Sequence, residues 1–139
     1  MAKRMALDVG DSWVGVAISD EMGLLARPYA TLKREDLVQS IEGYLIKEPI
    51  SHMVVGLPRT MKGTDSDQTR STREVFAELK DRFPGVVWLL WDERLTSQWA
   101  SGLGHKKRTM ASIKEEKQKE HARAAAFILQ GYLSSIPRD

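Results

Sequence analysis

An aspartate inside an apolar strand pattern is the residue of this sequence best suited to chemistry. Asp8 lies in the run Met-Ala-Leu-Asp-Val at 5–9, which otherwise has the composition of a buried strand. Burying an ionised carboxylate costs roughly several kcal/mol of hydration free energy unless a cation or hydrogen-bond donors compensate it. We therefore expect a partner for Asp8, and a divalent metal ion is the simplest one.

A second apolar run leads to a second group of acids. The segment 86–91 is uniformly apolar and is followed by Asp92, Glu93 and Arg94. If both runs are strands of one sheet, Glu93 can reach the same site as Asp8. Clustered carboxylates balance the charge of cations that activate water and stabilise a leaving oxygen, which suits metal-assisted hydrolysis of phosphodiester bonds. The alternative is that Asp8 accepts hydrogen bonds from its own turn and that Glu93 pairs with Arg94.

The spacing of apolar residues predicts the elements that must position these acids. Strands are expected at 5–9, 14–19, 24–32, 50–57 and 86–91. Helices are expected at 35–48, around 75–83, at 98–103 and at 112–134. This order predicts an α/β fold with a mixed five-stranded sheet, in which an antiparallel meander is joined by parallel strands and flanked by helices. The first strand is expected in a central position.

Composition limits both the class of protein and the kind of metal site. The 139 residues, 42% hydrophobic and 29% charged, suffice for one globular domain spanning 1–139. No apolar run reaches the roughly 18 residues of a membrane span, and the N-terminal pattern is not that of a signal peptide, so we expect a cytoplasmic protein. Cysteine is absent. A metal must therefore be held by oxygen or imidazole ligands, which favours Mn²⁺ or Mg²⁺.

Basic residues gather in polar segments expected to be loops. The net charge of +2 is too small to indicate a polyanion partner, so the placement of the charges matters more. The candidates for contacts with nucleic-acid phosphates are Arg59, Lys62, Arg94, Lys106, Lys107 and Arg108. A solvated surface without a specific ligand explains the same charges equally well. Among the aromatic residues, Trp13 at the first turn is the one placed for base stacking, whereas Trp88 and Trp91 are expected in the core.

Five segments of the chain resemble the YqgF/RuvX family. They are Leu-Asp-Val-Gly at 7–10, Gly-Val-Ala-Ile-Ser-Asp at 15–20, Val-Val-Gly-Leu-Pro at 54–58, Trp-Asp-Glu-Arg-Leu-Thr at 91–96 and Ala-Ala-Ala-Phe-Ile-Leu-Gln-Gly-Tyr-Leu at 124–133. Each motif alone is weak, but their order and spacing together are specific. The family is a bacterial branch of the RNase H-like superfamily, similar to the Holliday junction resolvase RuvC. The resemblance implies a nuclease that processes the 5′ end of precursor 16S ribosomal RNA.

The resemblance also implies three catalytic, metal-binding positions. Asp8 corresponds to the ligand on the first strand, and Glu93 to the acid of the Asp-Glu-Arg motif. The family pattern has an aspartate on the last helix, seven residues before the Ile of Ile-Leu-Gln, where this chain has His121. A neutral imidazole can bind Mn²⁺ or act as a general base, but it brings no negative charge to balance a second cation. Glu120 is the neighbouring alternative, about 100° away around the helix.

Other functions stay open at the level of sequence. One is resolution of four-way DNA junctions, and another is a non-catalytic nucleic-acid-binding module that lost the chemistry through the change at His121. Actin-like kinases share the Asp-x-Gly hairpin, but they need two such domains to enclose a nucleotide, and no Gly-x-x-x-x-Gly-Lys-Ser/Thr sequence is present. The sequence does not distinguish RNA from DNA, or a monomer from a homodimer.

Overall fold

The five predicted strands and the helices predicted at 35–48, around 75–83 and at 112–134 are present in the computed structural model, which describes residues 2–57, 67–92 and 110–136, without the side chains of 110–119. The elements are β1 (Lys3–Val9), β2 (Trp13–Ser19), β3 (Ala26–Lys33), the 3-10 helix η1 (Arg34–Asp36), α1 (Leu37–Lys47), β4 (Ile50–Leu57), α2 (Asp67–Arg82), β5 (Val87–Asp92) and α4 (Met110–Ser135). The ends of the five strands differ from the predicted ends by at most two residues. The helix predicted at 98–103 lies outside the described residues.

The five strands form one mixed sheet with β1 in the middle, as predicted. Their order is β3-β2-β1-β4-β5, in which β1–β2 and β2–β3 are antiparallel and β1–β4 and β4–β5 are parallel. The carboxyl ends of β1, β4 and β5 therefore meet at one edge of the sheet. β5 is an edge strand, and its apolar run is not fully buried: Val87 is 50% and Leu90 39% exposed.

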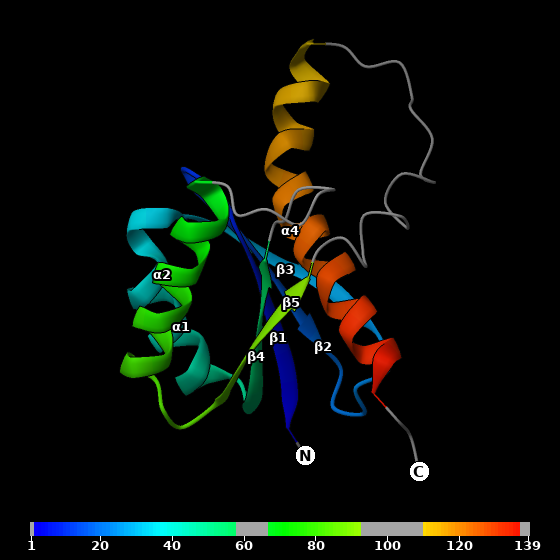
Figure 1. Cartoon of the computed structure of the whole chain (residues 1–139). Coiled ribbons are helices and arrows are strands. Elements are labelled where there is room, and N and C mark those ends of the chain that lie inside the picture. Colours follow the sequence, from blue (N-terminus) through cyan, green and yellow to red (C-terminus); the bar gives the residue numbers. More distant parts are fainter. Residues whose placement is uncertain (1, 58–66, 93–109, 137–139) are drawn as a thin grey trace.

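Helices cover both faces of the sheet, α1 and α2 on one side and α4 on the other (Figure 1). Large side chains fill the α1/α2 face, where Met5, Leu7 and Val16 pack with Ile41 of α1 and Leu79 of α2. The face toward α4 carries small residues, among them Ala6 and Ala17. Small residues on a sheet let a helix backbone come close, and this close approach brings α4 to the carboxyl end of β1.

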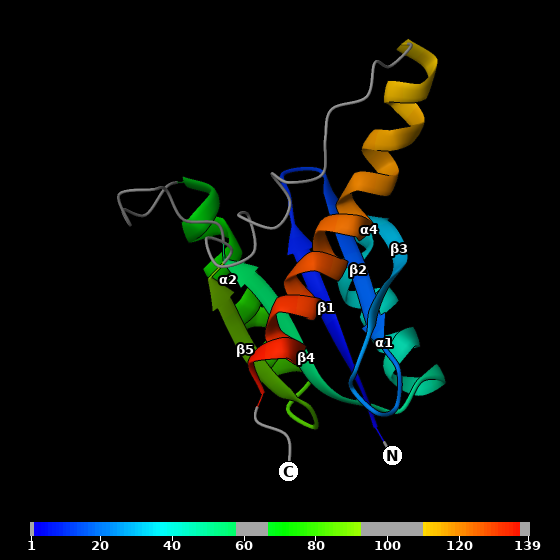
Figure 2. The same cartoon turned by 90° about the vertical axis from the view of Figure 1, so that its right-hand side faces the viewer.

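Helix α4 crosses the sheet and extends past the edge at which β1 ends (Figure 2). It packs on β2, β3 and β1, and its buried stripe is Ala125, Ile128, Leu129 and Leu133. Gln130 fixes its position: the side-chain Oε1 accepts a hydrogen bond from the Ala26 N–H at 2.9 Å, and Nε2 donates to the Leu24 carbonyl at 3.1 Å. The rotation of α4 about its own axis is thereby tied to the turn between β2 and β3.

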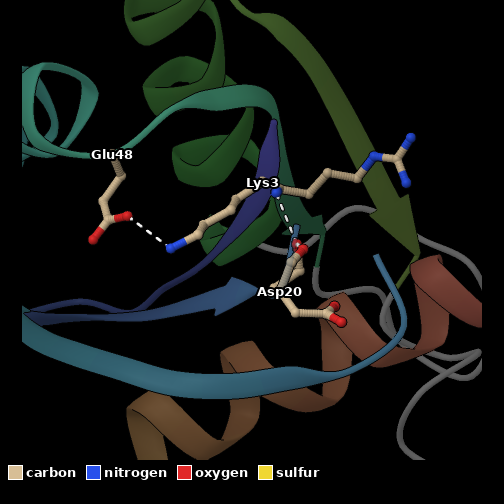
Figure 3. A network of polar contacts seen from close by, with 5 residues as sticks. Lys3, Asp20 and Glu48 are labelled. Carbon is tan, nitrogen blue, oxygen red and sulfur yellow. Dashed lines mark hydrogen bonds and ion pairs between the residues drawn. The ribbon is translucent and has the colours of Figure 1, made fainter. Parts of the chain in front are cut away.

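A polar network closes the opposite end of β1 (Figure 3). The Lys3 Nζ atom lies 3.0 Å from Glu48 Oε2, just after α1, and the Arg4 N–H donates to Ser19 Oγ at 2.9 Å. Asp20 Oδ1 accepts hydrogen bonds from the backbone N–H groups of Leu24 and Leu25 at 2.7 and 3.1 Å, and these bonds lower the pKa of the Asp20 carboxyl. Because this network joins neighbouring elements at the end away from Asp8, its role is structural.

Candidate functional site

Asp8 lies near the carboxyl end of the middle strand, on the face covered by α4. Its Cα is directly opposite that of Gly15 in the β1–β2 ladder, and directly opposed residues project to the same face. Asp8 also follows Ala6 by two positions, and Ala6 packs against α4. The side chain is half-buried. The sequence prediction that places a carboxylate within the apolar strand is confirmed.

The backbone of α4 rests directly on Gly15. A Cβ atom on Gly15 would lie 1.7 Å from the carbonyl oxygen of His121, 2.2 Å from its carbonyl carbon and 2.9 Å from the N atom of Ala122. These distances leave room only for glycine, since real Cβ atoms essentially never approach another heavy atom within 3.0 Å. Gly15 is thus paired with Asp8 on the strand side and covered by the backbone at His121 on the helix side.

The His121 side chain points along the same face toward the β1–β2 turn. A Cβ atom on Gly10 would lie 4.0 Å from His121 Cε1, and Gly10 is two residues beyond Asp8 on the same face. His121 is half-buried, whereas Glu120 is exposed. Two residues from opposite ends of the sequence, Asp8 and His121, are thereby neighbours at the carboxyl edge of the sheet.

The third predicted acid follows a strand that ends at this edge. β5 ends with Asp92, and Trp91 is paired with Gly56 of β4. With neighbouring strands about 4.8 Å apart, the ends of β1 and β5 are roughly 10 Å from each other with β4 between them. Glu93 itself lies outside the described residues. Within the described part of the chain, no three His, Asp or Glu side chains gather as a potential metal site.

The basic residues predicted to contact nucleic acid lie outside the described residues. They are Arg59, Lys62, Arg94, Lys106, Lys107 and Arg108. The expectation for two tryptophans is confirmed, because Trp88 is 6% exposed in the core and Trp91 packs edge-to-face on Tyr132, with ring centroids 5.9 Å apart. Among the described helices, none is long and apolar enough to cross a membrane.

Arg34 is a residue of the site that the sequence analysis missed. Its Nη1 atom donates to the Gly10 carbonyl at 3.2 Å, its Nη2 atom donates to Ser71 Oγ of α2, and its backbone N–H donates to the Ser12 carbonyl at 2.9 Å. Gln68 of α2 adds a long contact from Nε2 to the Val9 carbonyl at 3.5 Å. These bonds tie the end of β1 to α2. No local pattern marks Arg34, because all of its partners are remote in sequence.

Comparison with known proteins gives the same family as the motifs. A family model described as "RuvX: Holliday junction resolvase" matches residues 2–135. A protein of Thermoanaerobacter pseudethanolicus is 39% identical over 136 residues, covering 94% of this chain and 95% of that protein. A protein of Sulfurihydrogenibium sp. is 35% identical over 138 residues, covering 98% and 92%. Both carry the name "Putative pre-16S rRNA nuclease".

A solved structure confirms the fold. Thermus thermophilus RuvC, solved in complex with a Holliday junction substrate, superimposes with a TM-score of 0.58 at 10% identity, covering 97% of this chain and 95% of that one. The mixed sheet flanked by helices is therefore the RNase H-like fold that the resemblance predicted. With matches along nearly its whole length in family model, relatives and fold, the chain belongs to the RuvX family.

Proposed function

We propose that this protein is a divalent-metal-dependent nuclease that cleaves phosphodiester bonds at the 5′ end of precursor 16S rRNA. The observation that supports this proposal is the placement of Asp8 on the middle strand, under His121 of α4, at the edge where β1, β4 and β5 end. The names of the relatives supply the substrate. The fold alone does not, because one fold hosts many reactions.

Asp8, Glu93 and His121 are the proposed metal ligands. The described residues fit such a role, since a half-buried carboxylate and a half-buried imidazole are neighbours on the face that α4 covers, at the edge where β1 ends. Two carboxylates and one imidazole offer oxygen and nitrogen donors, which suits Mn²⁺ better than Mg²⁺. When bound, a divalent cation supplies charge stabilisation and makes a water molecule more acidic.

The chain's own residues have separate proposed roles. Asp8, fixed by the rigid middle strand, orients the site, and Glu93 adds negative charge from the end of β5. His121 in its neutral form either donates a nitrogen lone pair to the cation or accepts a proton from the attacking water. The basic side chains of Arg59, Lys62, Arg94, Lys106, Lys107 and Arg108 are proposed to hold phosphates of the substrate strand.

The decisive experiment compares cleavage by the wild-type protein and matched variants. The substrates are a precursor RNA spanning the 5′ end of 16S rRNA, an unstructured RNA and a four-way DNA junction, each with Mg²⁺, Mn²⁺ or EDTA. We expect the wild type to shorten the precursor RNA with Mn²⁺, and Asp8→Asn and Glu93→Gln to lose this activity while still binding the RNA. A variant that loses RNA binding as well as cleavage would point to misfolding, which circular dichroism detects.

The same assay tests the departure from the family pattern at the third position. His121→Ala is expected to reduce Mn²⁺-dependent cleavage by roughly 100-fold or more, the usual contribution of a positioned acid–base group. Glu120→Ala is the matched control on the exposed side of α4 and is expected to cleave normally. Intact activity in His121→Ala together with lost activity in Glu120→Ala would reverse the assignment.

Resolution of four-way DNA junctions is the second candidate function. It is favoured by the description of the matching family model and by the similarity to RuvC bound to a junction. Symmetric cleavage of two strands requires two sites related by a two-fold axis, so this function predicts a homodimer, whereas trimming of one RNA end needs only a monomer. Selective cleavage of the junction, with a dimer in sedimentation, would favour the second function. Binding of RNA or DNA without any cleavage would instead favour the non-catalytic module.

We also propose the extent of the domain and the place where the enzyme acts. One nuclease domain over 1–139 is proposed to act in the cytoplasm, where ribosomal RNA of a bacterium is transcribed and trimmed.

A further inference from the structure

A pocket of about 470 Å³ lies beside the Asp8 edge and has no role in the mechanism above. Its lining consists of Asp11, Ser12, Trp13, Lys33, Arg34 and Glu35. We propose that this pocket binds one unpaired nucleotide of the substrate strand, with the base stacked on the Trp13 indole and an adjacent phosphate held by the Lys33 ammonium. The inference deepens the proposed nuclease function and rests on it for the identity of the ligand.

The β1–β2 hairpin places Trp13 on the same face as Asp8. Gly10 N–H donates to the Trp13 carbonyl at 2.8 Å, so these two residues face each other across the turn. Trp13 precedes Gly15 by two positions, and Gly15 is directly opposite Asp8. Trp13 is therefore the diagonal cross-strand neighbour of Asp8, at roughly 7–8 Å. That separation is on the scale of one nucleotide along a strand, so a strand bound at Asp8 can also reach Trp13.

Lys33 is the direct cross-strand partner of Trp13. The β2–β3 register pairs the two residues, which puts their side chains on one face with Cβ atoms about 5 Å apart. Lys33 is exposed, and its ammonium forms no ion pair within the described part of the chain. An aromatic face with a cation beside it is the usual composition of sites that hold single-stranded nucleic acid. We therefore assign the phosphate contact to the Lys33 ammonium.

The other charged residues of the pocket limit what it can hold. The Arg34 guanidinium already donates to the Gly10 carbonyl and to Ser71 Oγ, so it forms a fixed wall rather than a free phosphate ligand. Asp11 and Glu35 bring two negative charges to the pocket, which disfavour a run of several phosphates. The composition therefore fits a single base with one phosphate on the Lys33 side. It does not fit a groove that follows a long backbone.

Binding measurements without cleavage test this proposal. Asp8→Asn protein in EDTA is titrated into a fluorescein-labelled 12-nucleotide RNA, a DNA of the same sequence and a fully paired RNA duplex, and the dissociation constant is read from anisotropy. Trp13→Ala in this background is expected to bind the single-stranded RNA about 5- to 150-fold more weakly, the range for loss of one stacked base. Trp13→Phe is expected to retain most of the affinity. The duplex, whose bases are already stacked, is expected to respond little. An equal loss for RNA and DNA would show that the pocket reads the base and phosphate, not the sugar.

Lysine variants and tryptophan fluorescence supply independent readouts. Lys33→Gln is expected to lower the slope of log K against log salt by about 0.7, the value for one phosphate contact on a single strand. Lys47→Gln is the control, because Lys47 is an exposed lysine at the end of α1, at the opposite edge of the sheet. Unlabelled RNA should quench tryptophan fluorescence in the Asp8→Asn parent more than in its Trp13→Phe derivative, since stacking acts on that indole.

The outcomes separate the pocket from the nuclease. If Trp13→Ala and Lys33→Gln bind single strands as Lys47→Gln does, the pocket proposal is wrong, while metal-dependent cleavage by the wild type would leave the nuclease proposal in place. If the wild type cleaves nothing but Trp13→Ala still loses single-strand affinity, the pocket stands and the nuclease proposal falls. If neither RNA nor DNA binds the parent, both proposals fail.

Discussion

Substitution of Gly15 by alanine tests the geometry of the candidate site most directly. The added Cβ atom would lie 1.7 Å from the His121 carbonyl oxygen and must reach at least 3.0 Å, so one of the two backbones has to move by about 1.3 Å. The nearest atoms are backbone atoms of His121 and Ala122, which cannot rotate away as a flexible side chain can. We therefore expect α4 to be displaced from β2 at the point where His121 faces the end of β1.

Two magnitudes follow from this displacement. Forced overpacking of a tight contact costs about 1–3 kcal/mol of unfolding free energy. For a chain of this size, about 3–4 °C per kcal/mol gives a fall of roughly 3–12 °C in the melting temperature. A shift near 1 Å in a catalytic group costs about 100-fold in rate. Cleavage should thus fall far more than the folded fraction does at the assay temperature.

The assay combines thermal unfolding, followed by circular dichroism, with Mn²⁺-dependent cleavage under saturating RNA. Gly43→Ala is the matched control: Gly43 lies inside α1, and a Cβ atom there would meet no heavy atom within 4 Å. Alanine is favoured over glycine in a helix by about 1 kcal/mol, so this control should raise the melting temperature and leave cleavage unchanged. The same chemical change is therefore expected to act in opposite directions at the two positions.

An unchanged melting temperature and full cleavage in Gly15→Ala would refute the close contact between α4 and β2. Loss of stability with full cleavage would retain the contact but remove His121 from the reaction. Normal stability with lost cleavage would place the effect at Asp8, which is paired with Gly15 in the sheet.

Two further predictions concern Arg34 and His52. Arg34→Ala should lower the unfolding free energy by about 1–3 kcal/mol in urea titrations, because the Gly10 carbonyl and Ser71 hydroxyl lose a charged donor. The control Arg82→Ala removes an exposed pair with Glu78 and should change the unfolding free energy by no more than about 0.5 kcal/mol. Equal losses in the two variants would contradict the role of Arg34 in tying β1 to α2. Burial, with a smaller contribution from the Arg4 charge, lowers the pKa of His52 below its usual 6.5. As pH falls below that value, the unfolded chain takes up a proton at His52 before the folded one does. Stability should therefore decline toward pH 5 in the wild type and decline less in His52→Gln. Identical pH dependence in the two proteins would show that the pKa of His52 is not lowered by folding.

Several features of the site follow from local sequence. Apolar runs between turn residues predict the strands, and Asp8 is recognisable because a charge interrupts one of them. The family motifs indicate Asp8, Glu93 and His121 by position along the chain. The run at 86–91 shows the limit of this reasoning: it predicts a strand correctly, but its apolar composition does not reveal that β5 lies at the sheet edge with Leu90 exposed.

The sequence by itself determined the elements, the family and which residue types stand at the ends of the strands, because hydrophobic period and turn chemistry are local properties. The tertiary structure decided which of these residues meet. Pairing register places Asp8 opposite Gly15 and Trp13 opposite Lys33, and only the docking of α4 onto a glycine brings His121 to that face. The contacts of Arg34 with Gly10 and Ser71 are likewise decided by packing between remote segments. Such contacts depend on strand order and helix approach, which no local pattern contains.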